Sequence, residues 1–316
     1  MARPFNRKEG VLNWTPGNQE RLQLSRNYHM QYLMVELEMT HDNAAGADFK
    51  DEAIFSLINQ VEIVANGNEN LKQIPGHKLY INNVLNTGEQ GINKIDKTEG
   101  AGKVSKVTAL INFNMFNTVR PYDTILNTAV FTTFDLLINW GSDVNLGTGV
   151  TIKSAKAKVS SSSLVGYKRN DKETIKYYKE TAILEEITST TSEYTITLPV
   201  KKIYKSIAVV GMVNGKRNDS LIKGVKIKSG TTVISELDAS TIRAANNFEY
   251  KPKDADFLKA MYITNFLTRG MLSDALNTMT NFNTLEVVLD VEKQAGGTNN
   301  VYIYSDTVQD TNILEK

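Results

Sequence analysis

The sequence predicts an all-β chain built from two similar β-sandwich units. Short segments rich in β-branched and aromatic residues recur along it, separated by turn-forming residues. Asn and Thr are frequent, with 31 and 30 copies among 316 residues, and strong helical patterns are rare. A chain of this length exceeds one ordinary sandwich and suits two domains of roughly 100–200 residues each. An internal repeat supports the same division.

The expected strands are regularly spaced and bounded by turn signals such as Asn66-Gly67, Asn214-Gly215 and Ser229-Gly230. This arrangement indicates sandwiches or barrels rather than a parallel sheet with crossover helices. Short connecting helices are expected at Phe49–Leu57, Ala239–Asn247 and Ala255–Lys259. The expected strands are Gln31–Met39, Val61–Ala65, Leu79–Ile81, Val107–Phe116, Thr133–Trp140, Val150–Val159, Tyr194–Leu198, Ser206–Val213, Gly224–Lys228, Met261–Phe266, Thr284–Val291 and Val301–Tyr304.

Two blocks of the chain recur in the same order. Leu57–Ile63 and Leu221–Ile227, 164 residues apart, share an L-I-x-x-V-charged-I pattern that is followed by a turn glycine. Leu126–Ile138 resembles Leu276–Leu289, with most paired positions 151 residues apart. An Asn pair lies between the blocks in each copy, at 82–83 and 246–247. Apolar strings can match by chance in any β protein, but two ordered blocks favour a duplicated scaffold.

The repeat sets the expected domain boundaries. Because the offset falls from 164 to 151, the first copy is longer between the blocks, and the polar segment Glu89–Lys106 is the expected inserted loop. Glu62 in one copy corresponds to Lys226 in the other, which predicts a solvent-facing strand position rather than shared chemistry. The predicted organisation is a basic N-terminal arm at 1–26, a first unit at 27–163, a linker at 164–181 and a second unit at 182–316.

Composition excludes several classes of protein. The formal charge is only +1, whereas a chain built to neutralise many phosphates carries a large basic surplus, so no direct nucleic-acid role is expected. The absence of cysteine excludes disulfides and thiolate chemistry. No window approaches the roughly 18 continuous apolar residues of a membrane helix. The N-terminus also lacks the apolar stretch of a signal peptide, so we expect synthesis in the cytoplasm.

A search for catalytic and metal-binding patterns finds no nucleotide-binding, zinc-protease or hydrolase motif. His41-Asp42 could form a catalytic pair, although a His beside an Asp near a loop is usually plain surface. Asp48, Asp51 and Glu52 could bind Ca²⁺, or could simply interact with the dipole of a short helix. We therefore expect no enzyme activity, no catalytic residues, no cofactor and no metal site.

Two tandem β-sandwiches of about 140 residues without cysteine resemble the double jelly-roll major capsid proteins. The similarity is greatest to those of lipid-containing icosahedral phages, namely corticoviruses and the lipid-containing phage of Flavobacterium. The residues that carry it are Asn27–Leu37, after the basic arm, then Leu57–Gly67, Leu71 and Leu79-Tyr80. They are apolar patterns rather than a specific signature, and they cover the first unit better than the second.

The resemblance implies a specific architecture and role. The fold would be two tandem eight-stranded jelly rolls with short connecting helices. Three chains would form a pseudo-hexameric homotrimer that tiles an icosahedral virion shell over an internal membrane. Its partners would be neighbouring trimers, other capsid proteins at the vertices and viral membrane lipid. A tandem sandwich that binds a glycan or a receptor, as a spike protein does, is the alternative, and a glycan-active enzyme on a jelly-roll scaffold is a third possibility.

The predicted contact site is the N-terminal arm. In capsid proteins of the resembled type such an arm lies beneath the shell near the membrane. Basic side chains are attracted to anionic lipid and Trp favours the headgroup region. The alternatives for this arm are lipid contact, contact with another subunit, and a flexible solvated tail. The residues assigned to the contact are Arg3, Phe5, Arg7, Lys8, Trp14, Arg21 and Arg26.

Overall fold

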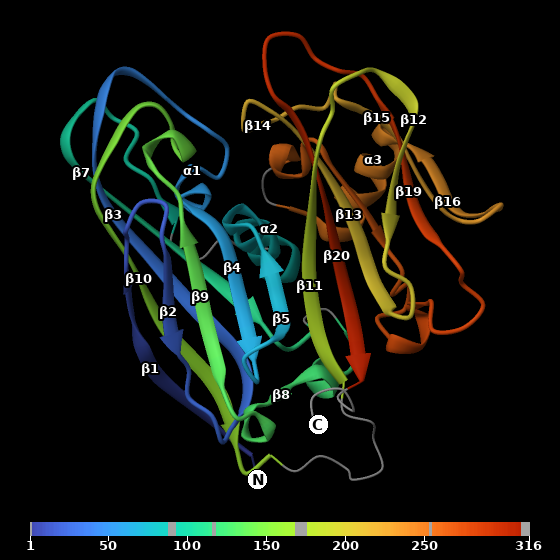
Figure 1. Cartoon of the computed structure of the whole chain (residues 1–316), viewed down its shortest axis with the longest axis horizontal. Helices are drawn as coiled ribbons and strands as arrows, with labels where there is room; N and C mark the ends of the chain where they lie inside the picture. Colours follow the sequence, from blue (N-terminus) through green and yellow to red (C-terminus); the bar gives the residue numbers. More distant parts are fainter. Residues whose placement is uncertain (1, 88–92, 116–117, 168–175, 253–254, 311–316) are drawn as a thin grey trace. The chain divides into compact units, whose positions relative to one another are not determined.

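The structure is a computed structural model that describes residues 2–87, 93–115, 118–167, 176–252 and 255–310. The chain divides into two compact units, the first extending to Lys179 and the second comprising Glu180–Gln309 (Figure 1). The boundary falls inside one strand, β11 (Lys176–Glu186). None of the described helices is both long enough and apolar enough to cross a membrane.

Unit 1 is a sandwich of two antiparallel sheets. One sheet has the order β1–β10–β3–β7–β6, with β8 also paired to β3, and the other contains the run β2–β9–β4–β5. Its strands and helices are β1 (Arg3–Asn13), β2 (Gln19–Gln23), β3 (His29–Phe49), α1 (Ala53–Ser56), β4 (Ile58–Ala65), β5 (Glu69–Ile74), α2 (Gly76–Thr87), β6 (Asn93–Lys94), β7 (Gly100–Asn112), β8 (Leu126–Asn127), β9 (Phe134–Trp140), β10 (Gly147–Val165) and the 3₁₀ turns η1 (Pro121–Thr124), η2 (Thr128–Val130) and η3 (Asp143–Asn145).

Alternation along the strands places the core between these sheets. In β3, Leu33, Val35 and Leu37 are buried while Met34 and Glu36 point outward, as the period of two in a strand requires. The inward side chains of both sheets form one hydrophobic cluster that includes the buried Trp140.

Unit 2 repeats this design. One sheet has the order β12–β19–β15–β16, and β13 lies between β20 and β17 in the other, with β11 beside β20. Its strands and helices are β12 (Thr191–Leu198), β13 (Ile203–Val213), β14 (Lys216–Arg217), β15 (Ile222–Ser229), β16 (Thr232–Asp238), α3 (Ala239–Tyr250), η4 (Ala255–Leu258), β17 (Met261–Asn265), η5 (Leu272–Asp274), β18 (Leu276–Asn277), β19 (Leu285–Val291) and β20 (Asn299–Asp310).

The main strands of the two units correspond one to one. Taken in chain order within each unit, their positions in the two sheets are 1–8–3–6 and 2–7–4–5. Strands β1, β10, β3 and β7 therefore match β11, β20, β13 and β17, whereas β2, β9, β4 and β5 match β12, β19, β15 and β16. This order is that of an eight-stranded jelly roll.

The sequence repeat is confirmed by the register of the strand pairs. In unit 1, Ile63 of β4 lies opposite Leu136 of β9, and in unit 2, Ile227 of β15 lies opposite Val287 of β19. These are the positions that the offsets of 164 and 151 match. Both pairs of strands also carry an irregularity at the same place, before Gln60 and before Gly224.

Matching side-chain hydrogen bonds extend the repeat. Asn83 of α2 accepts a hydrogen bond from the Leu110 N–H at 2.9 Å and donates one to the Thr108 carbonyl at 2.8 Å, both in β7. Asn246 of α3 likewise donates one hydrogen bond and accepts one, each at 2.8 Å, but both are made to a single residue of β17, Ile263. In each unit one asparagine therefore satisfies backbone groups at the edge of the corresponding strand.

Several local expectations were wrong. Residues 3–13 and 19–23, which were assigned to an arm outside the first unit, form strands β1 and β2 of that unit. Leu79–Ile81 lies in helix α2, because a short apolar run does not by itself distinguish a strand from a buried helix. Within the expected loop 89–106, residues 89–92 lie outside the described part of the chain, but Gly100–Lys106 belongs to strand β7.

Most described residues of the expected linker 164–181 also belong to strands, with Gly166 and Tyr167 outside them. Leu164 and Val165 end β10, and β11 begins at Lys176, while 168–175 lie outside the described residues. Helix α2 requires a glycine at its first residue, because a Cβ at Gly76 would lie 2.1 Å from the Phe55 carbonyl oxygen. Only glycine allows the helix to approach that backbone.

Candidate functional site

The predicted contact residues separate into two groups. Trp14, Arg21 and Arg26 make contacts within unit 1. The Trp14 Nε1–H donates to the Gly141 carbonyl at 3.0 Å, and its ring packs against the core of the unit. Arg21 pairs with Asp135 at 2.7 Å, and Arg26 donates to the Phe131 carbonyl at 2.7 Å. Sequence alone did not indicate these internal roles, since each partner is more than 100 residues away.

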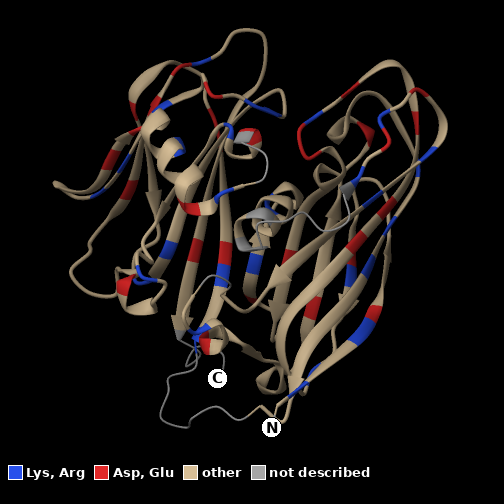
Figure 2. Cartoon of the chain, turned by 180° about the vertical axis from the view of Figure 1, so that it is seen from behind, with Lys and Arg blue, Asp and Glu red and all other residues tan. Residues whose placement is uncertain are grey.

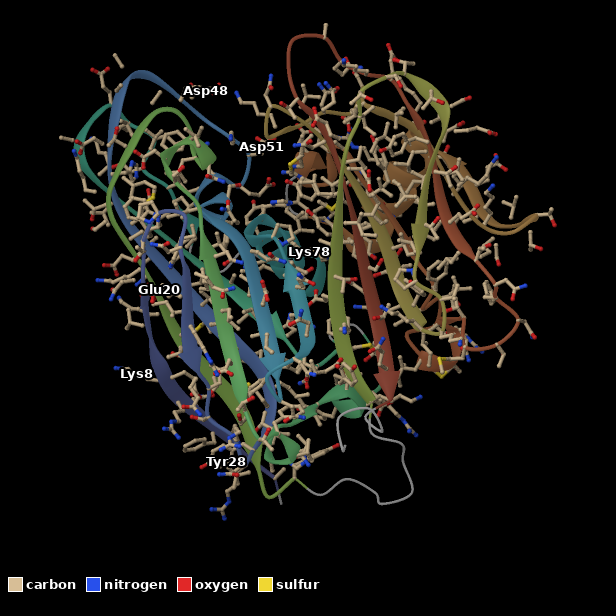
Figure 3. All side chains as sticks on the ribbon, in the orientation of Figure 1. Lys8, Glu20, Tyr28, Asp48, Asp51 and Lys78 are labelled. Carbon is tan, nitrogen blue, oxygen red and sulfur yellow. The ribbon has the colours of Figure 1, made fainter. Side chains whose placement is uncertain are left out.

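The second group lies on strand β1. Arg3, Phe5, Arg7 and Lys8 are all exposed there, and Phe5 keeps 38% of its surface accessible although its ring lies 5.1 Å from that of Tyr28. In Figure 3 the labelled Lys8 projects away from the strands. Among the described strands, β1 pairs only with β10, so one side of its backbone has no strand beside it. These four residues form an exposed basic strand at a sheet edge.

Glu9 fixes this strand in position. Its carboxylate accepts hydrogen bonds from the backbone N–H of Ser25 at 2.9 Å and from the Ser25 hydroxyl at 2.7 Å, and it also accepts from Ser161 of β10. The one acidic residue of β1 is thus engaged inside the unit. The charge that β1 presents to solvent is therefore positive.

The outer face of the β1–β10–β3–β7 sheet carries a closed ladder of ion pairs. Glu36 contacts Lys106 at 2.8 Å and Lys158 at 3.1 Å, while Glu38 contacts Lys158 at 2.8 Å and Lys156 at 2.9 Å. Figure 2 shows basic and acidic residues side by side on neighbouring strands. Each charge of this ladder contacts an opposite charge, which leaves the ladder little attraction for an outside partner.

The ladder shifts the acidity of its carboxylates. Hydrogen bonds from Lys158 and then from Lys156 lower the pKa of Glu38 to about 2. The hydrogen bond from Lys106 likewise lowers the pKa of Glu36. Both carboxylates are therefore ionised at neutral pH, and the network is fully charged there.

Unit 2 has a hollow on the outer face of its β12–β19–β15–β16 sheet. This groove, of about 460 Å³, crosses all four strands and also reaches the start of α3. Gly224 of β15 lies in its floor, and a Cβ there would meet only ordinary contacts, 3.6 Å from Asp290 Cβ and 3.7 Å from the Leu237 carbonyl oxygen. The charged residues that line it are Glu193, Lys226, Glu236, Asp238 and Asp290.

The groove has an excess of negative charge. Lys226 is paired with Glu236 at 2.7 Å, and the hydrogen bond that it donates to Glu236 raises the pKa of Lys226. Four carboxylates against one ammonium leave a formal charge of −3. Asp238 precedes α3 without forming a side-chain cap bond. The sequence signal for this site is Gly224 itself, because a glycine inside a strand can mark close approach by another group.

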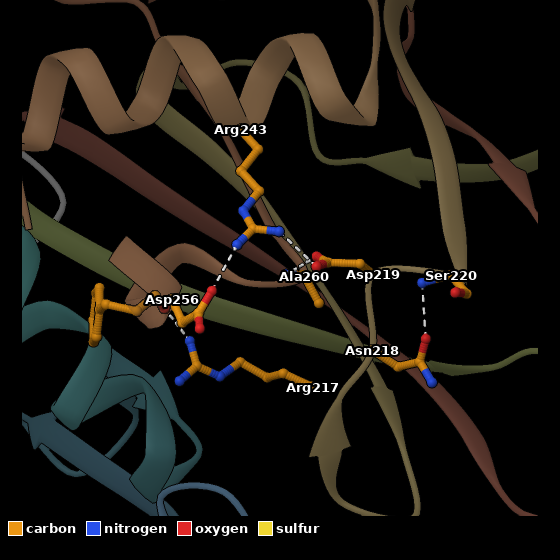
Figure 4. A network of polar contacts seen from close by, with 8 residues as sticks. Arg217, Asn218, Asp219, Ser220, Arg243, Asp256 and Ala260 are labelled. Atoms are coloured by element: carbon orange, nitrogen blue, oxygen red, sulfur yellow. Dashed lines mark hydrogen bonds and ion pairs between the residues drawn. The ribbon is translucent and has the colours of Figure 1, made fainter. Parts of the chain in front are cut away.

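A separate polar network anchors α3. Asp219 accepts hydrogen bonds from Arg243 of α3 at 2.6 Å and from the Ala260 backbone N–H at 2.5 Å (Figure 4). Arg243 also contacts Asp256 at 3.2 Å. These groups satisfy one another across a loop, the helix and η4, so the network holds unit 2 together.

The candidate catalytic and metal residues are not assembled into a site. His41 is buried in β3, with Nδ1 2.7 Å from Asn43 Oδ1 and Nε2 2.8 Å from Ser105 Oγ, whereas Asp42 points outward to Lys153 at 2.9 Å. The two residues face opposite sides of the sheet, as neighbours in a strand must. Asp48, labelled in Figure 3, is exposed near the end of β3. The described residues contain no group of three or more His, Asp or Glu side chains arranged for a metal ion.

Comparisons by sequence and by structure give different results. Searches of protein-family models and of curated proteins find no match. The structure, however, is similar to the STIV MCP, with a TM-score of 0.75 at 16% identity, covering 97% of this chain and 96% of that one. The chain has the double jelly-roll fold.

Two further solved structures share this fold over nearly their whole length. The major capsid protein of bacteriophage PM2 matches with a TM-score of 0.61 at 14% identity, covering 99% of both chains. The PBCV-1 virus capsid structure matches with a TM-score of 0.64 at 11% identity, covering 98% of this chain and 94% of that one. The expected fold class is thereby confirmed, and both units are present in the same order.

Proposed function

We propose that this chain is a major capsid protein that forms the shell of an icosahedral virion. The observation that carries the proposal is the double jelly-roll fold, shared over almost the full chain with the STIV MCP and the major capsid protein of bacteriophage PM2. Fold alone does not determine function, but here the likeness extends to both units and their order. The role is structural, and no catalytic step is part of it.

The proposed assembly unit is a homotrimer. Two similar lobes per chain give six lobes around a threefold axis, which is a block suited to hexagonal tiling. Closed cyclic symmetry requires each subunit to present two different complementary surfaces. A stable trimer of this kind is expected to bury well over roughly 2,000 Å². Neighbouring trimers, vertex proteins and the lipid of an internal membrane are the further proposed partners.

A glycan- or receptor-binding role receives less support. Sugar-binding sites commonly present an exposed aromatic face, but Trp140 is buried in the core of unit 1 and Trp14 packs against that core. The hollow in unit 2 is lined by carboxylates and aliphatic groups, with no aromatic ring among them. The hollow therefore offers no aromatic ring on which a sugar could stack.

Native mass spectrometry of the purified full chain tests the proposal. We expect a trimer of about 106 kDa, three times the 35.2 kDa of one chain, followed by closed shells or flat hexagonal sheets in electron micrographs at higher concentration. A stable monomer that binds an immobilised glycan would overturn the proposal and support the alternative.

A further inference from the structure

The exposed edge of β1 differs from the opposite edge of its sheet. On the opposite side of the sheet, next to the two-residue strand β6, Asn83 of α2 occupies backbone groups of Thr108 and Leu110 in β7. Beside β1 the described chain places no strand, and Arg3, Arg7 and Lys8 have no ion-pair partner there. A free edge with three cations is protected from indiscriminate pairing by its charge, yet it remains available to a partner of opposite charge.

The groove of unit 2 offers that opposite charge. Its formal charge of −3 is opposite in sign to Arg3 and Arg7, which share one face of β1, and to Lys8 on the other face. It also has an apolar component, because Leu237 at its rim is 44% exposed. At about 30 Å³ per water molecule, its 460 Å³ corresponds to roughly 15 waters, which is room for several side chains.

The dimensions of the two surfaces also agree. From β12 to β16 there are three inter-strand spacings, or roughly 14 Å. Arg3 and Arg7 lie on the same face of β1, four residues apart, which is also roughly 14 Å along a strand. A strand laid across the groove can therefore place one Arg near Glu193 on β12 and the other near Glu236 on β16. Phe5, midway between them, then lies over Gly224.

We propose that β1 of one copy docks across the acidic groove of unit 2 in a second copy of this chain. Arg3 and Arg7 pair with the carboxylates at the two sides, and Phe5 fills the hollow above Gly224 beside Leu237. The contact joins two different surfaces, so it is head to tail and can close into a ring of three. This inference rests on the proposed function and identifies one of the surfaces that would form the trimer.

Unit 1 supplies a natural comparison for the groove. Where unit 2 has Gly224 opposite Asp290, unit 1 has Gln60 opposite Asn139 at the matching register position. The substitution Gly224→Gln therefore introduces a side chain that the same scaffold already accepts. A Cβ at Gly224 also meets no contact shorter than 3.6 Å, so the variant is expected to fold.

The test uses the full chain and measures trimer formation by native mass spectrometry and sedimentation. We expect Arg3→Glu with Arg7→Glu to raise the dissociation constant of the trimer at least roughly hundredfold, because like charges then face each other. Gly224→Gln is expected to have a similar effect by filling the groove. Glu193→Arg with Glu236→Arg is expected to weaken the trimer alone and to restore it when combined with the reversed β1. The control Lys259→Glu with Lys293→Glu changes the net charge equally, at exposed positions outside the groove, and is expected to leave the trimer intact.

The outcomes separate this inference from the proposed function. If the unmodified chain forms trimers and both the reversed β1 and Gly224→Gln leave the dissociation constant unchanged, the inference is wrong and the capsid proposal stands. If the unmodified chain forms no oligomer at all, both are overturned. Flotation with phosphatidylcholine vesicles, with and without anionic phosphatidylglycerol, tests whether β1 binds lipid instead of a second copy of the chain. Loss of vesicle binding by the reversed β1 without loss of the trimer would assign β1 to lipid and overturn the inference.

Discussion

The two jelly rolls share their strand order and strand register but differ in the residues on their outer faces. Their strands follow the same order, their repeated blocks pair in the same register, and one Asn in each holds an outer strand edge. On the outer face of corresponding sheets, Gln60 and Asn139 of unit 1 are replaced by Gly224 and Asp290 in unit 2. The interior has been retained because close packing tolerates few changes. The surfaces have been free to diverge, and the proposed contact lies where they differ.

The asparagines provide the strongest test of the shared interior. Removing Asn246 leaves the buried N–H and C=O of Ile263 without partners, at about 1–3 kcal/mol each. We expect Asn246→Ala to lower the free energy of unfolding by about 3 kcal/mol. Asn83→Ala should cost less, because its hydrogen bonds are partly accessible to water. Urea denaturation followed by circular dichroism measures both.

The matched control is Asn247→Ala, which alters the adjacent position of α3, where the side-chain oxygen has no hydrogen-bond partner in the described chain. Its cost should stay below about 1 kcal/mol. Equal losses for Asn246→Ala and Asn247→Ala would show that the helix-to-strand bonds contribute little, and the likeness between the units would then be one of topology only.

A threonine hydrogen-bond motif that both units share should have a smaller effect on the free energy of unfolding. The Thr128 hydroxyl donates to the Tyr28 carbonyl at 2.8 Å, and the Thr278 hydroxyl donates to the Lys202 carbonyl at 2.7 Å. The Thr128 hydroxyl also accepts a hydrogen bond from the Tyr28 N–H, and the Thr278 hydroxyl accepts one from the Lys202 N–H. Because both side chains are fully buried, Thr128→Val and Thr278→Val should each cost about 1–2 kcal/mol in urea denaturation.

The exposed Thr197→Val serves as the reference for replacing a hydroxyl by a methyl group. Similar losses at positions 128 and 278, both larger than this reference, would support a duplicated hydrogen-bond motif. A loss at only one of the two positions would restrict that motif to one unit.

The ion-pair ladder of unit 1 should have the smallest effect on the free energy of unfolding. The pKa of Glu38 is about 2 in the folded chain against 4.5 for the free side chain, so the stability it contributes is present above pH 4.5 and is lost as the pH falls towards 2. Surface pairs contribute roughly 1 kcal/mol or less after solvent screening. Glu38→Gln should therefore differ from the parent chain at pH 7 and coincide with it near pH 2.

Urea denaturation at the two pH values, with and without added salt, measures this difference. Salt should reduce it at pH 7 because exposed charges are screened. A difference that persists at pH 2 would mean that Glu38 acts through packing rather than through its charge.

Much of the fold could be predicted because its signals are local. The alternation in Gln31–Met39 and Thr284–Val291 and the turn at Asn66-Gly67 each depend on neighbouring residues only. The duplication could be recognised because the same core imposes the same apolar positions twice. The Asn pairs were also found, although the equivalent residues are Asn83 and Asn246, one step out of the register that the sequence suggested.

The candidate site could be predicted only in part. The basic character of the N-terminal segment was evident, but its form as strand β1 was not. Charged edge strands carry little hydrophobic periodicity. The partner of β1 is also distant in the sequence, since Arg3 lies opposite Val165. The groove was missed because its lining comes from four strands and one helix, spread from Ser192 to Asp290.

The sequence by itself therefore determined the all-β class, the duplication and the absence of a recognisable catalytic motif, since these follow from residue types and their local spacing. Only the tertiary structure decided that the N-terminal segment is an edge strand, that Trp14, Arg21 and Arg26 contact distant residues of unit 1, and that carboxylates from distant segments gather around Gly224. Edges and grooves arise from pairing between residues far apart in the chain, and no local pattern encodes which partners will meet.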